Sequence, residues 1–427
     1  MLIDVPKTNL KRVVIIGGGF AGLELSKQLH NHFQVVMIDK NNFHTFQPLL
    51  YQVATAGIEP DSIVYPLRKV FKGYGHFHFR MAGAHEVKPD QNLLHTSIGD
   101  IHYDYLILAT GSDTSYFGME RLRQYSMPMK SVQEALDLRS CILQNFETAL
   151  ISPDQNEREA LMNYVIAGGG PTGVELAGAL GELKKHVLPN DYPELDFRQM
   201  KITLIEGGPR ILGTFKEKAG EKAKGYLEEL GVKVLLNTRV TDYDGSVATT
   251  HEGATLHTKT LIWAAGVMGV SVPGIPKEAI QPNGRITIDE YCRVQGTKNI
   301  FAVGDVALMK TPEYPKGHPQ VAQVAIQMGT RLGKNLCCGD DPKPWKKFEY
   351  RDKGSMATIG RNKAVVESKI VTTQGFIAWL LWMFVHLIAL VGFRNRLVVF
   401  FNWLVNYFSY DRGMRLIIRP FEKKNNV

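Results

Sequence analysis

The sequence predicts an α/β protein with two Rossmann-like domains, the second inserted in the first, followed by a C-terminal helical region. Three observations carry this prediction. A glycine fingerprint follows a β-branched run twice, as VVIIGGGFAGLE and YVIAGGGPTGVE. Strand-like and helical segments alternate along most of the chain, which is the α/β pattern. Two further strands, YDYLILATG and TLIWAAG, end in Gly111 and Gly266, where the chain could cross between domains. The strands are expected near residues 11–16, 34–39, 103–109, 163–167, 201–206, 232–237, 260–264 and 299–303.

Each fingerprint has the parts that a pyrophosphate site needs. Its glycines allow a tight turn and a close approach of backbone to phosphate, and a helix follows whose N-terminal amides face the anion. An acidic residue also ends the next strand, as Asp39 after QVVMI and Glu206 after KITLI. We therefore expect one dinucleotide on each copy. The fingerprint residues are Gly17, Gly18, Gly19, Phe20, Ala21 and Gly22 in the first copy, and Gly168, Gly170 and Gly173 in the second.

The two acidic residues also indicate which dinucleotides are accepted. A carboxylate accepts hydrogen bonds from ribose hydroxyls but repels a 2′-phosphate. Asp39 and Glu206 therefore favour NADH over NADPH as the nicotinamide substrate. Arg210, four residues after Glu206, is the one residue nearby that could accommodate a 2′-phosphate.

The order of these segments predicts the domain boundaries. A strand that ends in Gly304 and Asp305, NIFAVGD, follows the second fingerprint domain and would complete the first one. The first domain is expected at residues 10–125 and 267–345, and the inserted domain at 126–266. Residues 346–427 form the C-terminal region.

Composition excludes several classes of protein. The chain has 427 residues with 44% hydrophobic content, which is ordinary for a folded protein of about three domains. No apolar segment precedes the first strand, so no secretory signal is expected. The four cysteines include no C-x-x-C or C-x4-C pair, which disfavours a disulfide reductase. No metal site is predicted.

The C-terminal region combines positive charge with apolar aromatic residues. Residues 341–427 contain 15 Lys or Arg and 6 Asp or Glu, a net charge of +9, whereas the whole chain carries +8. The same region contains FIAWLLWMFVHLIALVGF and LVVFFNWLVNYFSY. Nucleic acid is a possible partner for a basic surface, but basic charge interleaved with apolar aromatics indicates anionic lipid instead. A lipid membrane is therefore the expected partner.

Hydropathy leaves the mode of membrane association open. A helix over residues 376–393 would be roughly 27 Å long at ~1.5 Å per residue, close to the ~30 Å hydrocarbon core of a bilayer. The second apolar run is too short to form a helix that crosses the bilayer in the opposite direction. Arg394 and Arg396 separate the two runs. A spanning helix, helices lying on the surface, and a buried homodimer contact all fit this pattern.

Several motifs together resemble the type II NADH:quinone oxidoreductases, single-subunit members of the two-dinucleotide-binding-domain flavoprotein superfamily. The resemblance covers nearly the whole chain, from about Lys11 to Pro420. The glycine motifs indicate the superfamily only, and FQPLLYQVA, AQVAIQ and the aromatic tail narrow it to this family. The motifs that carry it are VVIIGGGFAGLE, NNFHTFQPLLYQVA, YLILATG, VIAGGGPTGVELAG, NIFAVGD, VAQVAIQ, GSMATIGRNKAV and GFRNR.

The resemblance implies an activity and a location. The protein would oxidise NADH and pass two electrons through FAD to ubiquinone or menaquinone, as a first step of a respiratory chain. Proton pumping is not expected, because His386 is the only ionisable residue within the apolar runs. The C-terminal helices would anchor the enzyme as a monotopic protein on the cytoplasmic face of the cell membrane, with a spanning helix as the second possibility, and the family implies a homodimer.

The resemblance also implies residue roles at the FAD site. The first fingerprint would hold FAD, with Asp39 and Lys40 at the adenosine ribose and Val87 at the adenine. Asp305 would contact the ribityl chain, although Asp at that position is also a common helix N-cap. Gly111 and Gly266 are assigned to the FAD and NADH sites respectively.

The reacting ends of the substrates are assigned in the same way. Glu175 would face the nicotinamide and flavin, although an acidic residue in a first helical turn can also simply offset the helix dipole. Glu24 occupies the same place in the first copy. Gln320, Gln323 and Gln327 recur on one face of a predicted helix, which is either a quinone contact or an exposed row of amides. Matching AQVAIQ places Gln323 at the quinone head group. The residues assigned nearby are Ala325 and Ile326 at the flavin ring, and Gln47 and Pro48 at the quinone.

Two other classes share parts of this pattern. Sulfide:quinone oxidoreductases have the twin glycine motifs but need a redox-active cysteine pair, which is absent after Asp39. A membrane-associated NADH-binding flavoprotein with a signalling role would share the whole pattern and would differ in its response to quinone.

Overall fold

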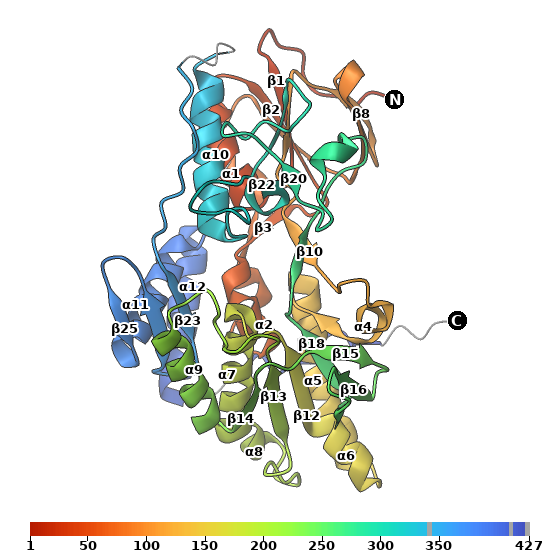
Figure 1. Cartoon of the computed structure of the whole chain (residues 1–427), viewed down its shortest axis with the longest axis vertical. Coiled ribbons are helices and arrows are strands. Elements are labelled where there is room, and N and C mark those ends of the chain that lie inside the picture. Colours follow the sequence, from red (N-terminus) through yellow and green to blue (C-terminus); the bar gives the residue numbers. More distant parts are fainter. Residues whose placement is uncertain (340–343, 410–412, 423–427) are drawn as a thin grey trace. The chain divides into compact units, whose positions relative to one another are not determined.

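The computed structural model describes residues 1–339, 344–409 and 413–422, and these form two compact units (Figure 1). Unit 1 comprises Met1–Thr45, Tyr65–Asp113 and Val267–Asp352. Unit 2 comprises Phe46–Val64, Thr114–Gly266 and Lys353–Val427. Each unit is built around a parallel sheet with helices, so the predicted α/β fold with two Rossmann-like sheets is confirmed.

The sheet of unit 1 has five parallel strands in the order β21-β9-β1-β2-β5. Its central strands are continuous runs of Val, Ile and Leu, as expected for a parallel sheet covered on both faces. Helices α1 and α10 pack closely, since a Cβ on Gly329 of α10 would lie 2.6 Å from the carbonyl oxygen of Ala21. The bounds of these elements are β1 Arg12–Ile16, α1 Phe20–Leu29, β2 Gln34–Asp39, β5 Phe77–Met81, β9 Tyr105–Leu108, β21 Ile300–Ala302 and α10 Ala322–Cys337.

Short elements complete unit 1. Strands β6, β7 and β8 form an antiparallel sheet, and β20 pairs with β22. The short strands β10 and β19 pair where the chain leaves and rejoins this unit. The bounds are β3 Phe43–Thr45, β4 Val64–Pro66, α3 Leu67–Val70, β6 Ala84–Lys88, β7 Leu93–Thr96, β8 Gly99–His102, β10 Ser112–Thr114, β19 Val267–Gly269, β20 Ile286–Thr287, β22 Ala307–Leu308, and the 3-10 helices Pro89–Gln91, Lys277–Ala279 and Gly304–Val306.

Unit 2 repeats the arrangement with the parallel order β11-β18-β12-β13-β14. Helix α5 begins at a capping box, in which Ser131 and Glu134 satisfy each other's backbone amides. Strands β15, β16 and β17 form a separate antiparallel sheet. The bounds are α4 Glu120–Tyr125, β11 Met127–Pro128, α5 Val132–Ile151, α6 Gln155–Met162, β12 Asn163–Ala167, α7 Pro171–His186, α8 Leu188–Asp191, β13 Lys201–Ile205, α9 Glu217–Glu229, β14 Val232–Leu235, β15 Val240–Tyr243, β16 Val247–Thr250, β17 Thr255–His257 and β18 Thr260–Trp263.

Unit 2 also contains a segment from the first 64 residues and the C-terminal region. The early segment holds the 3-10 helices Gln47–Leu49 and Pro60–Ser62 and helix α2 Leu50–Ala54. The C-terminal region holds an antiparallel sheet of β23 Ser355–Thr358, β24 Ala364–Glu367 and β25 Thr372–Gln374, followed by helices α11 Phe376–Ala389 and α12 Phe393–Ser409. The eight strands expected from the sequence all occur, within two residues of their expected ends.

Helix α12 is attached to the early segment by polar side chains along one face. The side chain of Asn395 donates to the carbonyl oxygen of Val64 at 2.8 Å, and that of Asn406 donates to Gly57 at 2.8 Å. Between them, the indole N–H of Trp403 donates to Gln52 at 2.7 Å. These directional contacts fix which face of α12 is turned inward.

The apolar run that the sequence places at residues 376–393 is not one helix. Helix α11 ends at Ala389, because Leu390 has the extended backbone angle ψ 138°, and α12 begins at Phe393. Among the described residues, no helix combines the length and the mean hydropathy needed to cross a bilayer.

Candidate functional site

The first fingerprint forms a turn that only glycine permits at two positions. Gly17 follows β1 with φ +109°, and a Cβ on it would lie 2.2 Å from the carbonyl oxygen of Ala109. A Cβ on Gly22 would lie 1.9 Å from the carbonyl oxygen of Gly17, so the first turn of α1 packs directly on the turn. Gly19, in contrast, has open space at its Cβ position. This open side at the start of α1 is where a pyrophosphate could approach the helix amides.

Asp39 holds this turn from the end of β2. One carboxylate oxygen accepts the amide N–H of Gly18 at 2.6 Å, and the other accepts that of Asn41 at 2.7 Å. Burial raises the pKa of Asp39, and these two hydrogen bonds and the nearby Lys40 partly offset the increase. The side chain of Lys40 is exposed.

His44 holds the same turn from the other side and was missed by the sequence reasoning. Its ring nitrogen Nδ1 lies 3.1 Å from the carbonyl oxygen of Gly18, and its edge packs against Phe20 with ring centroids 5.0 Å apart. Burial lowers the pKa of His44 to about 4, so the ring is neutral and Nδ1–H is the donor to Gly18. Its Nε2 atom is buried without a hydrogen-bond partner. The signal was present in the sequence, as a histidine in NNFHTFQPLL five residues after Asp39.

The loop that contains Asp305 lies against the N-terminal ends of α1 and α10. A Cβ on Gly304, which has φ +76°, would be 3.3 Å from both Ala21 and Ala325. The carboxylate of Asp305 accepts a hydrogen bond from the Ser112 hydroxyl at 2.6 Å. Asp305 does not act as a helix cap. It is held in one orientation beside the fingerprint.

The three glutamines expected on one helical face have different surroundings. Gln320 precedes α10 and donates to the carbonyl oxygen of Asp305 at 3.1 Å, so it supports that loop. Gln327 exchanges two hydrogen bonds of 3.0 Å with the backbone of Arg351. Gln323 is half-buried in the first turn of α10, between these two structural contacts.

The other residues assigned to the FAD site also lie in unit 1. Ala325 is buried and Ile326 is 38% exposed in α10. Gly111 has φ +74° and accepts the amide N–H of Val270 at 3.2 Å. Val87 is buried in β6, and its amide N–H is already donated to the carbonyl oxygen of Pro273 at 2.8 Å. That amide is therefore not available to an adenine.

The second fingerprint reproduces the geometry of the first within unit 2. Gly168 has φ +113°, and a Cβ on Gly173 would lie 1.9 Å from the carbonyl oxygen of Gly168. Gly170, at the start of α7, again has open space at its Cβ position. Glu206 accepts the amide N–H of Gly169 at 2.6 Å and that of Gly208 at 2.7 Å. Here the carbonyl oxygen of Gly169 accepts a backbone amide, that of Leu212 at 2.7 Å, in place of a histidine.

The acidic residues after the two fingerprints differ in environment. Glu24 is partly exposed and contacts Lys27 at 3.5 Å and Gln28 at 3.1 Å on its own helix. Glu175 is only 7% exposed, and its carboxyl accepts the amide N–H of Thr358 at 3.4 Å. Burial raises the pKa of Glu175 to about 8. Glu175 is therefore mostly protonated and uncharged at neutral pH.

The buried environment of Glu175 comes from the C-terminal region. Thr358 ends β23, and the indole of Trp382 in α11 also approaches the Glu175 carboxyl, which lowers its pKa slightly. The Trp382 indole N–H itself is buried and makes no hydrogen bond of normal geometry. Trp382 stacks on His386 with ring centroids 4.1 Å apart. Sequence reasoning did not identify Thr358 or Trp382, because only the fold brings residues 358 and 382 to residue 175.

The remaining assigned residues lie near the chain crossings of unit 2. A Cβ on Gly266 would be 2.6 Å from the ring of Phe117, and its carbonyl oxygen accepts the amide of Ser115 at 3.0 Å. Gln47 is exposed and Pro48 is half-buried in the 3-10 helix that precedes α2.

These observations fit two bound dinucleotides. Each fingerprint combines an open glycine at a helix start with a carboxylate at the end of the second strand, and unit 1 adds a buried, unpartnered His44 Nε2 beside the turn. The fold and these two sites define a flavoprotein-type oxidoreductase with two dinucleotide-binding domains.

Comparison with known proteins identifies the family. The family model described as pyridine nucleotide-disulphide oxidoreductase matches residues 11–329, and the NDH2 C-terminal domain matches residues 353–410. Two proteins of Mycobacterium tuberculosis, the type II NADH:quinone oxidoreductases NdhA and Ndh, are 35% and 34% identical to this chain. The matches cover 95% of this chain in both cases, and 89% and 90% of those proteins. The chain belongs to the type II NADH:quinone oxidoreductase family.

A solved structure agrees at the level of the fold. The structure of NDH2 from Plasmodium falciparum in complex with NADH has a TM-score of 0.86 and 21% sequence identity, and the match covers 96% of this chain and 100% of that one.

The His44 contact predicts an effect on FAD retention. Replacing His44 with Ala removes the donor to the Gly18 carbonyl oxygen and should loosen the turn that faces the pyrophosphate. We expect several-fold faster release of FAD, measured as free flavin fluorescence after desalting. His44→Asn keeps a hydrogen-bond donor, so its rate of FAD release should lie between those of the unsubstituted protein and His44→Ala. The control is His85→Ala, at an exposed histidine of β6. Equal FAD retention in His44→Ala and the control would contradict this role.

The raised pKa of Glu175 predicts a pH dependence of stability. The pKa is about 8 in the folded protein against an ordinary value of 4.5, so protonated Glu175 contributes stability that is complete below about pH 4.5 and is lost as the pH rises to about 8. Glu175→Gln stays neutral throughout. The melting temperature of Glu175→Gln minus that of the unsubstituted protein should therefore rise between about pH 5 and 8 and then level off. A difference that does not change with pH would show that Glu175 is not buried in this way.

Proposed function

We propose that this protein oxidises NADH and transfers two electrons through bound FAD to a membrane quinone, without proton pumping. The observation that carries the proposal is the difference between two otherwise matching fingerprints. Both have the same glycine geometry and the same carboxylate contact, but only the second is followed by a buried, uncharged glutamate. Membership of the type II NADH:quinone oxidoreductase family supports the same reaction.

Residues 10–125 and 267–345 would form the FAD domain. Asp39 would bind the adenosine ribose, with exposed Lys40 beside it, and the open face at Gly19 would take the pyrophosphate. Asp305, oriented by Ser112, would bind the ribityl chain. Bound FAD supplies the two-electron chemistry that side chains cannot perform.

Residues 126–266 would form the NADH domain. Glu206 accepts two backbone amides, and its carboxylate charge would lie beside the adenosine ribose. This charge favours ribose hydroxyls and disfavours a 2′-phosphate, which supports NADH as the substrate. Arg210 donates one N–H to the carbonyl oxygen of Gly213 at 3.1 Å, and its remaining N–H groups are the ones that could accommodate a 2′-phosphate.

Glu175 would position the nicotinamide. As a protonated carboxyl at neutral pH it can donate a hydrogen bond without adding negative charge to the site. Its walls, Thr358 and Trp382, keep water away from it. A charged glutamate in the same place would oppose the build-up of negative charge on a neighbouring reduced cofactor.

Gln323 would bind the quinone head group. The proposal rests on the match of AQVAIQ to the family, and Gln323 lies half-buried in the first turn of α10. A glutamine amide donates to a quinone carbonyl without a change of charge. Ala325 and Ile326 are proposed to lie at the flavin ring, and Gln47 and Pro48 are proposed as quinone contacts.

The C-terminal helices would anchor the protein on the cytoplasmic face of the membrane as a monotopic protein. The polar face of α12 is turned inward, and large apolar side chains are exposed on α11 and α12. Arg394 is 69% exposed at the junction of the helices, where it could meet anionic head groups. A homodimer is proposed from the family alone. The exposed apolar residues are Phe376, Ile377, Leu380, Phe384, Val385, Ile388, Phe393, Leu397, Phe400, Phe401, Leu404, Val405 and Phe408.

Proton pumping is not part of the proposal. His386 is the one ionisable side chain within the described part of α11, and burial lowers its pKa to about 4. A neutral histidine stacked on Trp382 does not form a chain of ionisable groups of the kind that pumps use.

The two half-reactions test this function. NADH should bleach the flavin in stopped-flow absorbance, and a quinone should restore its colour. Gln323→Ala should slow the quinone step by roughly two- to tenfold, the effect of one hydrogen bond, and leave reduction by NADH unchanged. Gln327→Ala is the control on the same helix. Flavin that NADH does not bleach would rule the function out, and NADH oxidation that quinone does not accelerate would favour a signalling role.

The exposed apolar face predicts membrane binding. Phe401 is 56% exposed on α12, and placing a charge there should weaken binding because that side chain would no longer enter the lipid. In flotation with anionic vesicles, Phe401→Glu should lose most of its vesicle-bound fraction. Ile151→Glu, at a residue of α5 that is 82% exposed, is the control and should float as the unsubstituted protein does. If both variants lose binding equally, α12 is not the anchor.

A further inference from the structure

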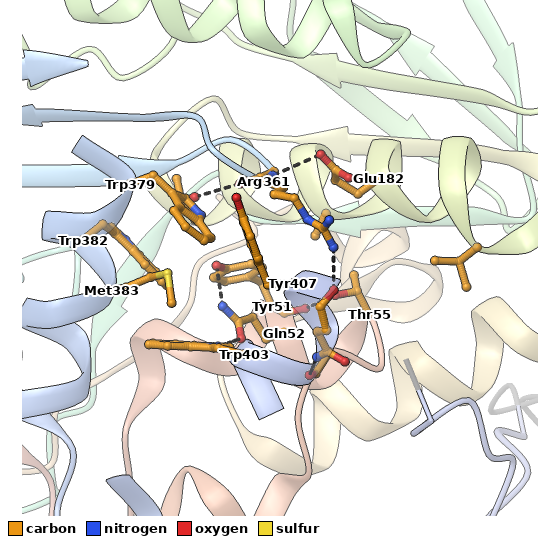
Figure 2. Close-up of a pocket in the computed structure, with 16 residues that line it drawn as sticks. Tyr51, Gln52, Thr55, Glu182, Arg361, Trp379, Trp382, Met383, Trp403 and Tyr407 are labelled. Carbon is orange, nitrogen blue, oxygen red and sulfur yellow. Dashed lines mark hydrogen bonds between the residues drawn. The ribbon is translucent and has the colours of Figure 1, made fainter. Parts of the chain in front are cut away.

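Unit 2 contains a polar hollow of about 550 Å³ that shares no lining residue with the aromatic cavity drawn in Figure 2. Its walls come from helix α6, the first residues of β12 and β13, and strand β17. Asn163 and Lys201 begin their strands here, whereas the second fingerprint follows the other end of β12. The hollow therefore lies at the opposite end of the parallel sheet from the proposed NADH site. Its volume is in the range of about 300–1,000 Å³ that ligand sites occupy.

One wall of the hollow is the edge of a small antiparallel sheet. Strand β17 is the last strand in the order β15-β16-β17, so it pairs with β16 on one side only. On that side, the amide N–H of Thr258 donates to the carbonyl oxygen of Ser246 at 2.9 Å. The backbone groups of successive residues alternate between the two sides of a strand. The N–H and C=O groups of Thr255 and His257 are therefore directed away from β16, on the side of the hollow.

Most of this edge is open to a partner. The carbonyl oxygen of His257 accepts the side-chain amide of Asn163 at 3.0 Å. No other residue in the described part of unit 2 pairs with the outward backbone groups of Thr255 and His257. Proteins often protect such edges with Lys or Pro, and the β17 sequence Thr-Leu-His has neither. The open edge can therefore serve as a template for a further strand.

The facing wall favours a neutral ligand with N–H groups. The Oδ1 atom of Asn163 is buried and has no hydrogen-bond partner among the described residues, which leaves an unmet acceptor in this wall. The charges at the rim balance, because the ammonium of Lys201 lies 3.7 Å from the carboxylate of Glu159. A ligand with a net charge would be attracted to one of these two groups and repelled by the other. An N–H group, in contrast, could satisfy the free acceptor.

We propose that the hollow binds an uncharged, extended peptide segment of another protein, which adds as a strand to the edge of β17. The peptide backbone would exchange two hydrogen bonds with Thr255 and accept a third from the amide N–H of His257. An apolar side chain on one face of the peptide would pack against Val165 and Leu256, which also line the hollow. This inference does not depend on the proposed function, because the hollow and the second fingerprint lie at opposite ends of the sheet.

Hydrogen–deuterium exchange of the FAD-loaded protein tests the proposal. The probe is the blocked peptide Ac-Ser-Thr-Val-Thr-Ser-NH2, which is neutral and has one apolar side chain. We expect saturable protection of the amides of Thr255 and His257. Strand β25 is the control, because it is also an edge strand with exposed ends, and its exchange should not change. Absence of protection at millimolar probe, or equal protection of β25, would overturn the proposal.

A modified probe separates strand addition from other modes of binding. The same peptide with a methyl group on every amide nitrogen cannot donate hydrogen bonds, and its methyl groups prevent the close approach of two strands. We therefore expect it to give no protection of β17. Equal protection by the methylated and unmethylated peptides would contradict strand addition. This comparison uses the unsubstituted protein, so it does not depend on the folding of any variant.

Two substitutions at one position provide a matched pair of variants. Thr255→Pro removes the outward N–H but no hydrogen bond to β16, and proline is tolerated at such edge positions. Its Kd for the probe, measured by titration calorimetry, should rise by at least roughly two- to tenfold, the effect of one hydrogen bond. Thr255→Val keeps the N–H and the shape of the side chain, and it should bind as the unsubstituted protein does. Equal Kd values for the two variants would contradict the proposed site.

A second copy of this chain is the other partner that could pair with β17. In that case the amides of Thr255 and His257 would become protected as the protein concentration rises, without any peptide. This result would overturn the proposal of a segment from another protein. Protection that requires the probe and does not change with protein concentration would support it.

Discussion

The structure depends on close contacts between backbone segments at the glycines of the two fingerprints, where there is no room for a Cβ atom. In each fingerprint the last glycine lies so near the first that a Cβ would be 1.9 Å from its carbonyl oxygen. This contact fixes the direction in which the following helix leaves the strand, and hence where its free amides point. A carboxylate from the next strand then holds the middle of the turn, through Asp39 in unit 1 and Glu206 in unit 2. The two nucleotide sites therefore start from the same geometry.

The difference between the sites arises from what each fold places around that common turn. In unit 1 the buried, neutral His44 contacts the fingerprint turn, and Ser112 orients Asp305 beside that turn. A resident cofactor would contact both places. In unit 2 the C-terminal region packs on α7 beyond its first turn, and Thr358 and Trp382 are neighbours of Glu175 there. The same region thus isolates Glu175 from water and exposes apolar side chains on its other helical faces. The burial of Glu175 and the exposed apolar face of α11 and α12 are two consequences of one C-terminal fold.

Much of this could be predicted from the sequence, because the decisive signals are local. Strands β1 and β12 are short, mostly apolar runs that lead directly into the glycines, and β2 and β13 are apolar runs whose ends carry Asp39 and Glu206. The C-terminal helices were harder to predict. Hydropathy does not reveal that the backbone turns at Leu390 and divides one apolar run into two helices. The row of three glutamines was only partly correct, because Gln320 lies before α10. The environment of Glu175 could not be predicted at all, because its burial depends on contacts with residues about 180 and 200 positions away.

The central claim is that two fingerprints with the same geometry bind different dinucleotides, FAD in unit 1 and NADH in unit 2. The most direct test compares two matched substitutions, Asp39→Ala and Glu206→Ala, each of which removes the carboxylate that holds its turn. Flavin content and the concentration of NADH needed for half-maximal flavin reduction would be measured for both. We expect Asp39→Ala to lose FAD, and we expect Glu206→Ala to keep FAD but to need a much higher concentration of NADH. Loss of FAD from Glu206→Ala, or full flavin content in Asp39→Ala, would contradict it.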